Sequence, residues 1–242
     1  MEKLEAYRLD DFYQGLENLG IALNEQQIQQ FLCYYEMLVE KNKVMNLTAI
    51  TEFDEVIEKH FLDSISLIKA IDLSKKQSVI DLGTGAGFPG IPLKIAFPEL
   101  EVTLVDSLNK RILFLQDVIE NLGLKNIRAV HDRAEIIAKS PDYREKFDLC
   151  VSRAVANLST LSEYCIPFVK VGGHFVSYKS GEVDEEVAAA QHAIELLGGK
   201  TKDIIRFDLG DAKRTFVVIQ KEKATKKKYP RKAGTPSKEP LS

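Results

Sequence analysis

Residues 78–90 read Ser-Val-Ile-Asp-Leu-Gly-Thr-Gly-Ala-Gly-Phe-Pro-Gly. The apolar residues at the start of this stretch predict a buried strand, and three alternating glycines follow at Gly83, Gly85 and Gly87. Glycine suits a sharp turn in which a ligand approaches the backbone, because a Cβ atom would clash there. An apolar segment at helical spacing then occupies 91–97, so the first N–H groups of a helix would point at that ligand.

Two classes of cofactor use such a turn, dinucleotides and S-adenosylmethionine, and the glycine spacing distinguishes them. The dinucleotide fingerprint G-x-G-x-x-G fails when counted from Gly83, because the sixth position is Phe88. Counted from Gly85 the fingerprint is met on paper, but Pro89 intrudes and the strand has already ended. The strand also carries Asp81 just ahead of the turn, and a carboxylate there suits the ammonium group of S-adenosylmethionine. The stretch therefore favours the methyl donor, with a glycine turn that binds no ligand as the remaining alternative.

The composition describes an ordinary globular protein. The chain has 242 residues, of which 45% are hydrophobic and 29% are charged, enough for one full core. No apolar run approaches the roughly 20 residues that a spanning helix needs, and no signal peptide opens the chain. We therefore expect a cytoplasmic protein with no membrane partner. The three cysteines lack C-x-x-C spacing and the four histidines are scattered, so we expect no metal site.

The charge is distributed unevenly along the chain. The formal net charge is −3, but residues 221–242 carry eight Lys or Arg side chains against two acidic ones. A basic arm on an acidic body indicates a polyanionic partner, and nucleic acid is the first candidate. The alternative is a solvated, frayed end of the chain.

The order of predicted elements indicates an α/β fold with a helical cap. Apolar residues recur at helical spacing through the first seventy residues, where Asn24 is a candidate N-cap and Asp54 begins another helix. From Ser78 onward, strands alternate with helices, which favours a mostly parallel sheet covered on both faces. The loop 208–213 is too short for a parallel crossover, so the last strand should be antiparallel. This predicts the seven-stranded, Rossmann-like sheet of class I S-adenosylmethionine methyltransferases. Strands are expected at 78–82, 101–106, 127–131, 147–151, 174–178, 203–207 and 214–220, and helices at 89–97, 109–122, 133–139, 157–169 and 183–197.

Ligands of open α/β sheets lie at the carboxyl ends of the strands, so the residues that end each strand are candidate site residues. Asp106 ends the second strand at a distance suited to gripping ribose hydroxyls, although it is also a good N-cap for the next helix. Ala134 and Glu135 follow the third strand, where they would edge an adenine ring. Arg153 ends the fourth strand, and a structural salt bridge and a catalytic-site role are equally good interpretations of it.

Two devices of other methyltransferases are absent from the sequence. An Asn/Asp-Pro-Pro-aromatic clamp, which serves exocyclic amines, does not occur. Neither Cys150, inside a predicted strand, nor Cys165, in the middle of a predicted helix, suits a nucleophile for pyrimidine carbon. A target whose lone pair is already available, such as guanine N7, needs neither device and requires in-line positioning. The sequence is consistent with such a target.

Several motifs, taken together and in order, resemble those of the bacterial small-subunit (16S) ribosomal RNA guanine-N7 methyltransferases, the family first named glucose-inhibited division protein B. The resemblance covers the chain from about residue 12 to the end, and one departure is the complete lack of tryptophan. The motifs are Asn46-Leu47-Thr48, His60-x-x-Asp63-Ser64, Asp81-x-Gly83-x-Gly85-x-Gly87-Phe88-Pro89-Gly90, Asp106-Ser107-x-x-Lys110-Arg111, Ser152-Arg153-Ala154 and Tyr229-Pro230-Arg231-Lys232-Ala233-Gly234-Thr235-Pro236.

The resemblance implies an enzyme that moves a methyl group from S-adenosylmethionine to N7 of one guanine in the decoding-region loop of 16S RNA. It implies a cap at 1–72, a cofactor-binding domain at 73–222 and an RNA-contact arm at 223–242. Arg153 would be the catalytic residue. Cofactor contacts are expected from Asp81, Gly83, Gly85, Gly87, Phe88, Asp106, Ala134, Glu135 and Arg153, and RNA contacts from Lys110, Arg111, Arg133, Lys179, Arg231 and Lys232.

The expected partner is 16S ribosomal RNA or the small ribosomal subunit, bound by a monomer. Two other functions stay open at this point. One is a methyltransferase acting on a small molecule or a protein, which the basic arm disfavours. The other is an RNA-binding assembly factor without catalysis, which the intact glycine turn disfavours. His60 is either a satisfied core histidine or, with Asp63, a residue that points from the cap toward the pocket.

Overall fold

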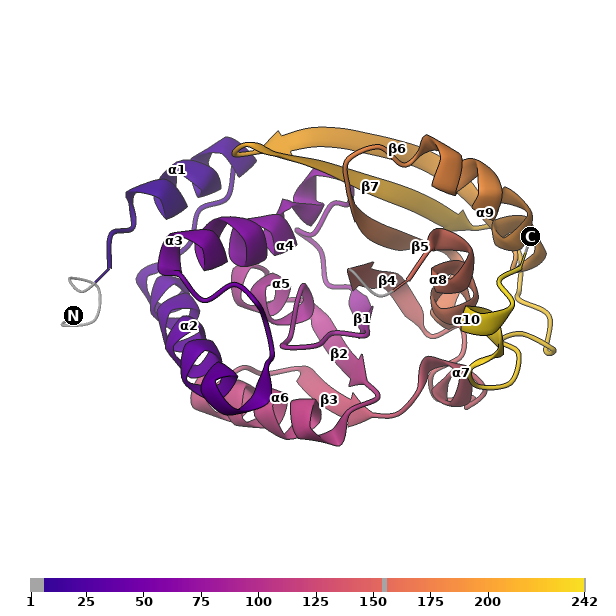
Figure 1. Cartoon of the computed structure of the whole chain (residues 1–242), viewed down its shortest axis with the longest axis horizontal. Helices are drawn as coiled ribbons and strands as arrows, with labels where there is room; N and C mark the ends of the chain where they lie inside the picture. Colours follow the sequence, from indigo (N-terminus) through magenta and orange to yellow (C-terminus); the bar gives the residue numbers. More distant parts are fainter. Residues whose placement is uncertain (1–6, 154–155, 242) are drawn as a thin grey trace.

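Seven strands form one sheet in the computed structural model, which describes residues 7–153 and 156–241 (Figure 1). Their order across the sheet is β3-β2-β1-β4-β5-β7-β6. All seven strands overlap the ranges predicted from the sequence. Their bounds are β1 Ser78–Leu82, β2 Glu101–Asp106, β3 Ile127–His131, β4 Phe147–Arg153, β5 Val169–Ser180, β6 Gly199–Leu209 and β7 Ala212–Lys221.

The direction of the last strand is the feature that identifies the class of fold. Strands β1 to β5 pair in parallel, whereas β7 lies between β5 and β6 and is antiparallel to both. β6 and β7 are joined at Gly210 and Asp211, too short a connection to cross back over the sheet. The predicted fold, a mostly parallel seven-stranded sheet with an antiparallel last strand, is confirmed.

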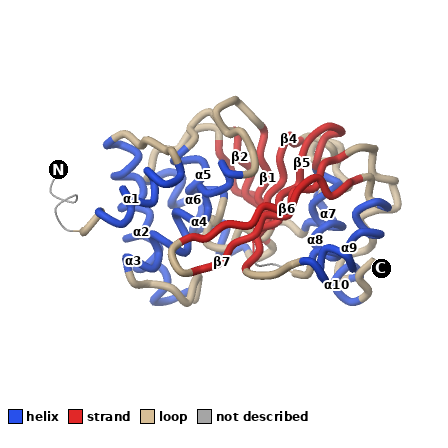
Figure 2. Tube along the Cα trace, turned by 90° about the horizontal axis from the view of Figure 1, so that it is seen from above, coloured by secondary structure: helices blue, strands red, loops and turns tan. Residues whose placement is uncertain are grey.

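Helices cover both faces of this sheet. Seen from above, one layer of helices lies on each side of the strands (Figure 2). The α-helices are α1 Asp10–Leu19, α2 Glu25–Met45, α3 Phe53–Val56, α4 Asp63–Ile65, α5 Gly90–Ala96, α6 Asn109–Asn121, α7 Ala134–Ile137, α8 Leu158–Cys165, α9 Asp184–Leu196 and α10 Thr235–Lys238.

The core is split by the sheet into two apolar clusters, because successive side chains of a strand point to opposite faces. Val79 of β1 packs with the cluster that contains α1, α2, α5 and α6. Its neighbour Ile80 packs with the cluster that contains α8 and α9. Burial on both sides explains why the central strands are almost continuously apolar.

The N-terminal helices pack on the sheet domain through α2. Asn24 is its N-cap, as predicted: the Asn24 side chain accepts from the Gln27 amide, and the Gln27 side chain accepts from the Asn24 amide, both at 2.9 Å. The same Gln27 side chain donates to the carbonyl of Ile95 at 2.7 Å, which ties α2 to α5. The division into a cap at 1–72, a domain at 73–222 and an arm at 223–242 stays a prediction.

Two helical segments differ from the sequence-based expectation. The helix expected at 157–169 ends at Cys165, and the 3-10 turn Ile166–Phe168, which contains Pro167, leads directly into β5. The helix expected from Asp54 begins at Phe53 and widens into the π-helical turn Ile57–Leu62, which carries His60. π-Helical turns are frequent at functional sites. In the part of the chain that the structure describes, no helix combines the length and the apolar character that crossing a bilayer requires.

Candidate active site at the strand ends

The glycine turn after β1 has the backbone conformation for which glycine is suited. Gly83, Gly85 and Gly87 have φ angles of 71°, 62° and 109°, in the left-handed region that strains other residues. The Gly83 amide donates to the carbonyl of Val105 at 2.9 Å, which fastens the turn to β2. The turn that follows β1 is therefore also anchored to the neighbouring strand β2.

Asp81 holds this turn from inside the protein. One carboxylate oxygen, Oδ2, accepts from the Thr84 hydroxyl at 2.6 Å and from the Gly90 amide at 2.8 Å. The other oxygen, Oδ1, is buried without a hydrogen-bond partner among the described residues. Burial raises the pKa of Asp81 to about 6, although the bonds from Thr84 and Gly90 act in the opposite direction. The cofactor contact predicted for Asp81 stays a prediction, and the free oxygen fits a donor such as an ammonium group.

A cavity of about 500 Å³ opens at the carboxyl ends of β1, β2 and β4, within the size range of small-molecule sites. Six of the residues predicted from the sequence line it: Gly83, Asp106, Arg111, Arg133, Ala134 and Glu135. The other predicted residues do not line it: Asp81, Gly85, Gly87, Phe88, Lys110, Arg153, Lys179, Arg231 and Lys232.

Asp106 links the turn to the helix that follows β2. Its Oδ2 accepts from the Gly85 amide at 3.0 Å and from Arg111 at 3.2 Å. Its Oδ1 accepts from the Leu108 amide at 2.9 Å, close to the start of α6. The N-cap prediction for Asp106 is therefore wrong: the N-cap of α6 is Leu108, without a side-chain cap bond, and Asp106 instead accepts from the Leu108 amide just ahead of the helix. The ribose contact remains a prediction, supported by the position of Asp106 on the cavity wall.

Sequence reasoning missed part of the cavity wall. Leu161, Tyr164 and Cys165 line it from α8, and their three- and four-residue spacing is the signal that marks one helix face. Gly234 and Ser237, near the end of the chain, also line the cavity. No local sequence pattern predicts their position there. Leu161, Tyr164 and Cys165 thus add apolar and aromatic surface to a cavity whose strand-end residues are largely polar.

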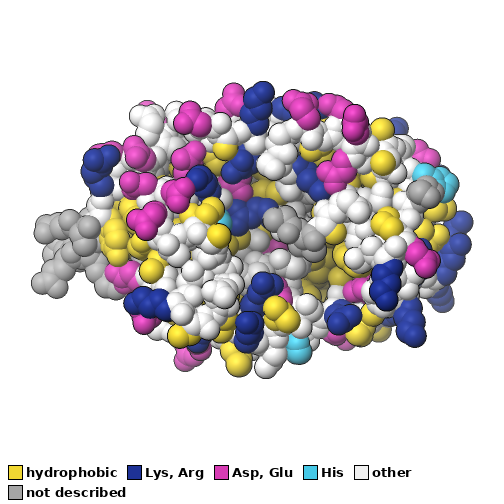
Figure 3. Space-filling view, in the orientation of Figure 1, with side chains coloured by type: hydrophobic (Ala, Val, Ile, Leu, Met, Phe, Trp, Pro, Cys, Tyr) yellow, Lys and Arg dark blue, Asp and Glu magenta, His cyan; other side chains and the backbone are white. Residues whose placement is uncertain are grey.

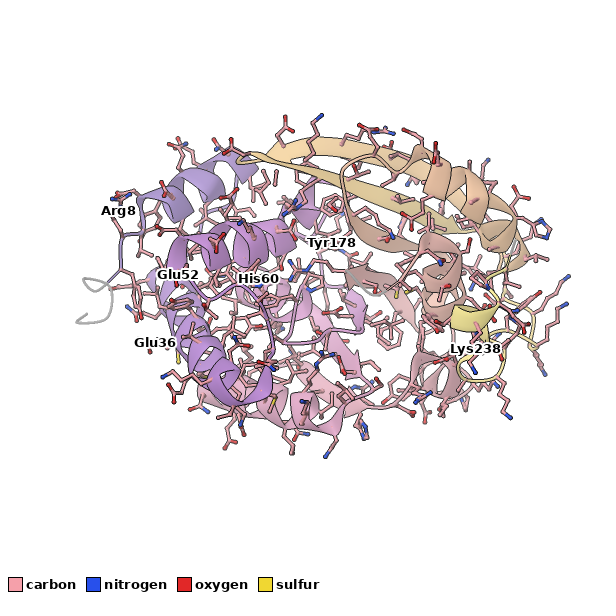
Figure 4. The ribbon with its side chains drawn as sticks, viewed as in Figure 1. Arg8, Glu36, Glu52, His60, Tyr178 and Lys238 are labelled. Atoms are coloured by element: carbon pink, nitrogen blue, oxygen red, sulfur yellow. The ribbon has the colours of Figure 1, made fainter. Side chains whose placement is uncertain are left out.

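A second cluster lies beside the glycine turn, between the N-terminal helices and the sheet. His60 stacks on Phe88 with ring centroids 4.5 Å apart, and the Arg153 guanidinium lies 5.1 Å from the same ring. Arg153 also lies 3.3 Å from Nδ1 of His60. Phe88 therefore connects the turn to the basic residue that ends β4. Figure 4 shows His60 and Tyr178 near the centre of the molecule, where the N-terminal helices meet the sheet.

Asp63 joins the two arginines of this cluster. Its Oδ2 accepts from Arg153 at 2.7 Å and its Oδ1 accepts from Arg214 at 2.6 Å. Asp63 is buried, and both arginines are mostly buried as well. The Tyr178 hydroxyl donates to the carbonyl of Ser64 at 2.8 Å, which holds the same helical turn on β5. Both interpretations of Arg153 thus survive: it makes a structural ion pair, and it stands beside the glycine turn.

The cations predicted to contact RNA fall into two groups. Lys110, Arg133 and Lys232 are exposed. Arg111, Lys179 and Arg231 are held by the carboxylates of Asp106, Glu186 and Glu163, at 3.2, 2.7 and 2.7 Å respectively. In the space-filling view, Lys and Arg side chains gather along the right-hand edge, where the C-terminal segment lies (Figure 3). Within residues 7–153 and 156–241, no group of three or more histidine, cysteine or acidic side chains is arranged to hold a metal ion.

The lowered pKa of His60 predicts that the folding stability of the protein depends on pH. Burial, and then the Arg153 guanidinium, lower this pKa from 6.5 to about 4. Between these two values the unfolded chain binds a proton that the folded chain does not, so folding stability falls as the pH drops from about 6.5 to about 4. The expected loss is about 3 kcal/mol.

Urea unfolding between pH 4 and 7.5 measures this effect when the wild-type protein is compared with His60→Gln. Asp81 has an opposite pH dependence, but it is present in both proteins and cancels in their difference. Parallel pH profiles for the two proteins would show that His60 is protonated normally in the folded state.

Comparison with known proteins agrees with this geometry. The family model for GidB, described as rRNA small subunit methyltransferase G, matches residues 27–216. A ribosomal RNA small subunit methyltransferase G from Lachnoclostridium phytofermentans is 56% identical over 232 residues, 95% of this chain and 96% of that protein. The protein of the same name from Acetivibrio thermocellus is 54% identical and covers 95% of each chain.

Solved structures support the fold. A crystal structure of a SAM-dependent methyltransferase from Aquifex aeolicus has a TM-score of 0.52 and 19% sequence identity. The match covers 68% of this chain and 92% of that one. At this identity the likeness shows a shared class I methyltransferase fold.

Proposed function

The chain belongs to the family of rRNA small subunit methyltransferase G, and from this we propose that it methylates N7 of a guanine in the decoding-region loop of 16S ribosomal RNA. It uses S-adenosylmethionine, which supplies an activated methyl group on its sulfonium. The expected product is 7-methylguanosine. The observation that carries the proposal is the cavity of about 500 Å³ beside the glycine turn, at the strand ends where ligands of this fold class bind.

The described residues suit the methyl donor. Asp106 offers a carboxylate on the cavity wall for ribose hydroxyls, and Ala134 leaves room for a flat ring beside α8. Leu161 and Tyr164 add apolar surface on the same side. Asp81, in the strand just ahead of the turn, keeps one buried carboxylate oxygen without a hydrogen-bond partner among the described residues, and this oxygen is an available acceptor for an ammonium group.

Transfer of the methyl group to guanine N7 requires little acid–base catalysis by the protein. The N7 lone pair is already available, so no residue has to remove a proton before the methyl group moves. The chain must hold the base in line with the sulfonium, and such positioning accounts for a large part of a barrier. We assign Arg153 to this positioning, because it projects from the end of β4 next to Phe88 of the turn.

The experiment that tests the function is transfer of labelled methyl from S-adenosylmethionine to isolated small-subunit RNA. Mapping of the modified position follows by reverse transcription in a strain that lacks the protein. Preference for a metabolite or a protein as acceptor would contradict the RNA assignment. Calorimetry that detects no S-adenosylmethionine binding would favour a non-catalytic assembly factor. The proposal implies a cytoplasmic enzyme whose partner is 16S RNA or the small subunit, and a monomeric state stays a prediction.

Asp106→Ala is expected to weaken S-adenosylmethionine binding by about 10- to 100-fold. The reason is the loss of charge-assisted hydrogen bonds, each of which contributes roughly 1.5–3 kcal/mol. Calorimetric titration with S-adenosylmethionine measures the change.

The matched control for this prediction is Asp132→Ala. Asp132 lines the same cavity, and its one described side-chain bond is to the adjacent Arg133 amide, at 2.7 Å. Equal losses in the two variants would show that the cavity needs negative charge in general and has no special need of Asp106.

A further inference from the structure

The basic C-terminal segment is docked on the body of the protein. Arg144 donates to the backbone carbonyls of Tyr229 at 2.9 Å and of Thr225 at 2.8 Å. The Tyr229 ring is buried in the cluster formed by α8 and α9. In Figure 1 the yellow C-terminal segment runs beside α7 and α8 and forms the short α10 before the chain ends.

A buried carboxylate fixes the middle of this segment. Glu163 on α8 has no exposed side-chain surface, and it accepts from the Arg231 amide at 2.7 Å and from Arg231 Nη2 at 2.7 Å. Arg231 also donates to the carbonyl of Glu239 at 2.7 Å. A buried charge without a partner is strongly unfavourable, so Glu163 is accommodated in α8 only when the segment is docked.

The end of the segment forms part of the cavity wall. The Gly234 amide donates to Glu135 at 2.8 Å, and the Thr160 hydroxyl donates to the carbonyl of Pro236 at 3.0 Å. Gly234 and Ser237 then line the cavity that also contains Asp106. Glu135, which was predicted as a cofactor contact, thus lines the cavity and also binds the C-terminal segment.

From these contacts we infer that residues 231–238 are the adenine-side wall of the S-adenosylmethionine site, and that Arg231 and Glu163 are positioning residues for the cofactor. This inference rests on the proposed function. The wall lies on the side of α7 and α8, where Ala134, Leu161 and Tyr164 provide surface for a purine ring. Arg231 is therefore turned inward, away from the RNA contact that its sequence context indicates.

The outer surface of the segment remains available to a polyanion. Lys226, Lys227, Lys228 and Lys232 are exposed. The segment therefore has two different sides, an inner one that shapes the cofactor site and an outer one that carries positive charge. The two sides can be tested separately.

Ser237→Phe tests the wall directly. Ser237 is exposed at the cavity rim, so a larger side chain there should leave the fold intact and occupy space that the cofactor needs. We expect calorimetry to show at least about tenfold weaker S-adenosylmethionine binding. This loss of binding free energy is about as large as the net contribution of one ordinary hydrogen bond. Lys227→Phe adds the same ring to an exposed position of the segment outside the cavity lining, and it should bind S-adenosylmethionine as the wild type does.

Arg231→Ala tests the positioning role. We expect the KM for S-adenosylmethionine to rise about tenfold while kcat at saturating cofactor stays within about twofold, with partial rescue by Arg231→Lys. Lys227→Gln with Lys228→Gln should show the reverse pattern, with unchanged cofactor affinity and weaker binding to small-subunit RNA. Should Arg231→Ala fail to fold, Ser237→Phe still decides the matter.

The outcomes separate this inference from the proposed function. Wild-type cofactor affinity in Ser237→Phe, or a fall in kcat alone in Arg231→Ala, would overturn the wall while leaving the methyltransferase assignment standing. A wild-type protein that binds no S-adenosylmethionine would overturn both.

Discussion

Arg153→Ala is expected to lower kcat for methyl transfer to small-subunit RNA by about 10²-fold, with the protein still folded. Arg153 is the last residue of β4, and its guanidinium lies 5.1 Å from the centre of the Phe88 ring in the glycine turn. A target base displaced by about 1 Å loses on the order of 10² in rate, because alignment with the methyl group is lost. Single-turnover methylation with labelled S-adenosylmethionine measures this step.

Arg214→Ala is the matched control for Arg153→Ala. Both arginines pair with the same carboxylate of Asp63, at 2.7 and 2.6 Å, and each single variant leaves the other pair in place. The two variants should therefore lose similar amounts of stability in urea. Only Arg153→Ala should lose turnover, and equal turnover in the two variants would assign Arg153 a purely structural role.

Asp63→Ala is expected to lower the free energy of unfolding by about 3–5 kcal/mol, because it leaves two largely buried arginines without their shared carboxylate. Asp63 holds together three parts of the chain: α4, to which it belongs, the end of β4 and the start of β7. Urea unfolding followed by circular dichroism measures the loss.

The control for Asp63→Ala is an ion pair of similar geometry at the surface. Asp184 accepts from Arg206 at 2.7 Å through both carboxylate oxygens, but its side chain is 66% exposed. Asp184→Ala should cost less than about 1 kcal/mol. A cost for Asp63→Ala as small as that for Asp184→Ala would mean that the arginines find other partners or water.

The parallel centre of the sheet was predictable from the sequence because β1, β2 and β4 are short, largely apolar runs followed by polar or glycine residues. The same regularity located Gly83, Asp106 and Ala134 on the cavity, since parallel strands present their carboxyl ends at one edge. The antiparallel last strand followed from the length of one loop. The strands, the site residues at their ends and the direction of the last strand all depend on residues close together in the sequence. A short stretch of sequence is therefore enough to predict each of them.

The remainder of the site depends on contacts between distant parts of the chain. Asp63 and Arg214 are 151 residues apart, and they meet because β7 inserts between β5 and β6. Glu135 and Gly234 are 99 residues apart, and no local pattern encodes their bond. The basic composition of the C-terminal segment predicted a polyanion partner, but it carried no sign of the inner face that Glu163 binds.

The antiparallel direction of β7 sets the path of the C-terminal segment. β7 runs away from the cavity edge, so the chain that follows it must travel back along α8 to reach that edge. From the end of the chain inward, this segment is held by the bond of Arg231 to the Glu239 carbonyl, then at the cavity wall by Ser237 and Gly234, then by Glu163, and last by Arg144. The contacts with the rest of the protein that lie nearest the end of the chain are thus those at the cavity wall, and the contacts nearest the sheet are those that Arg144 makes.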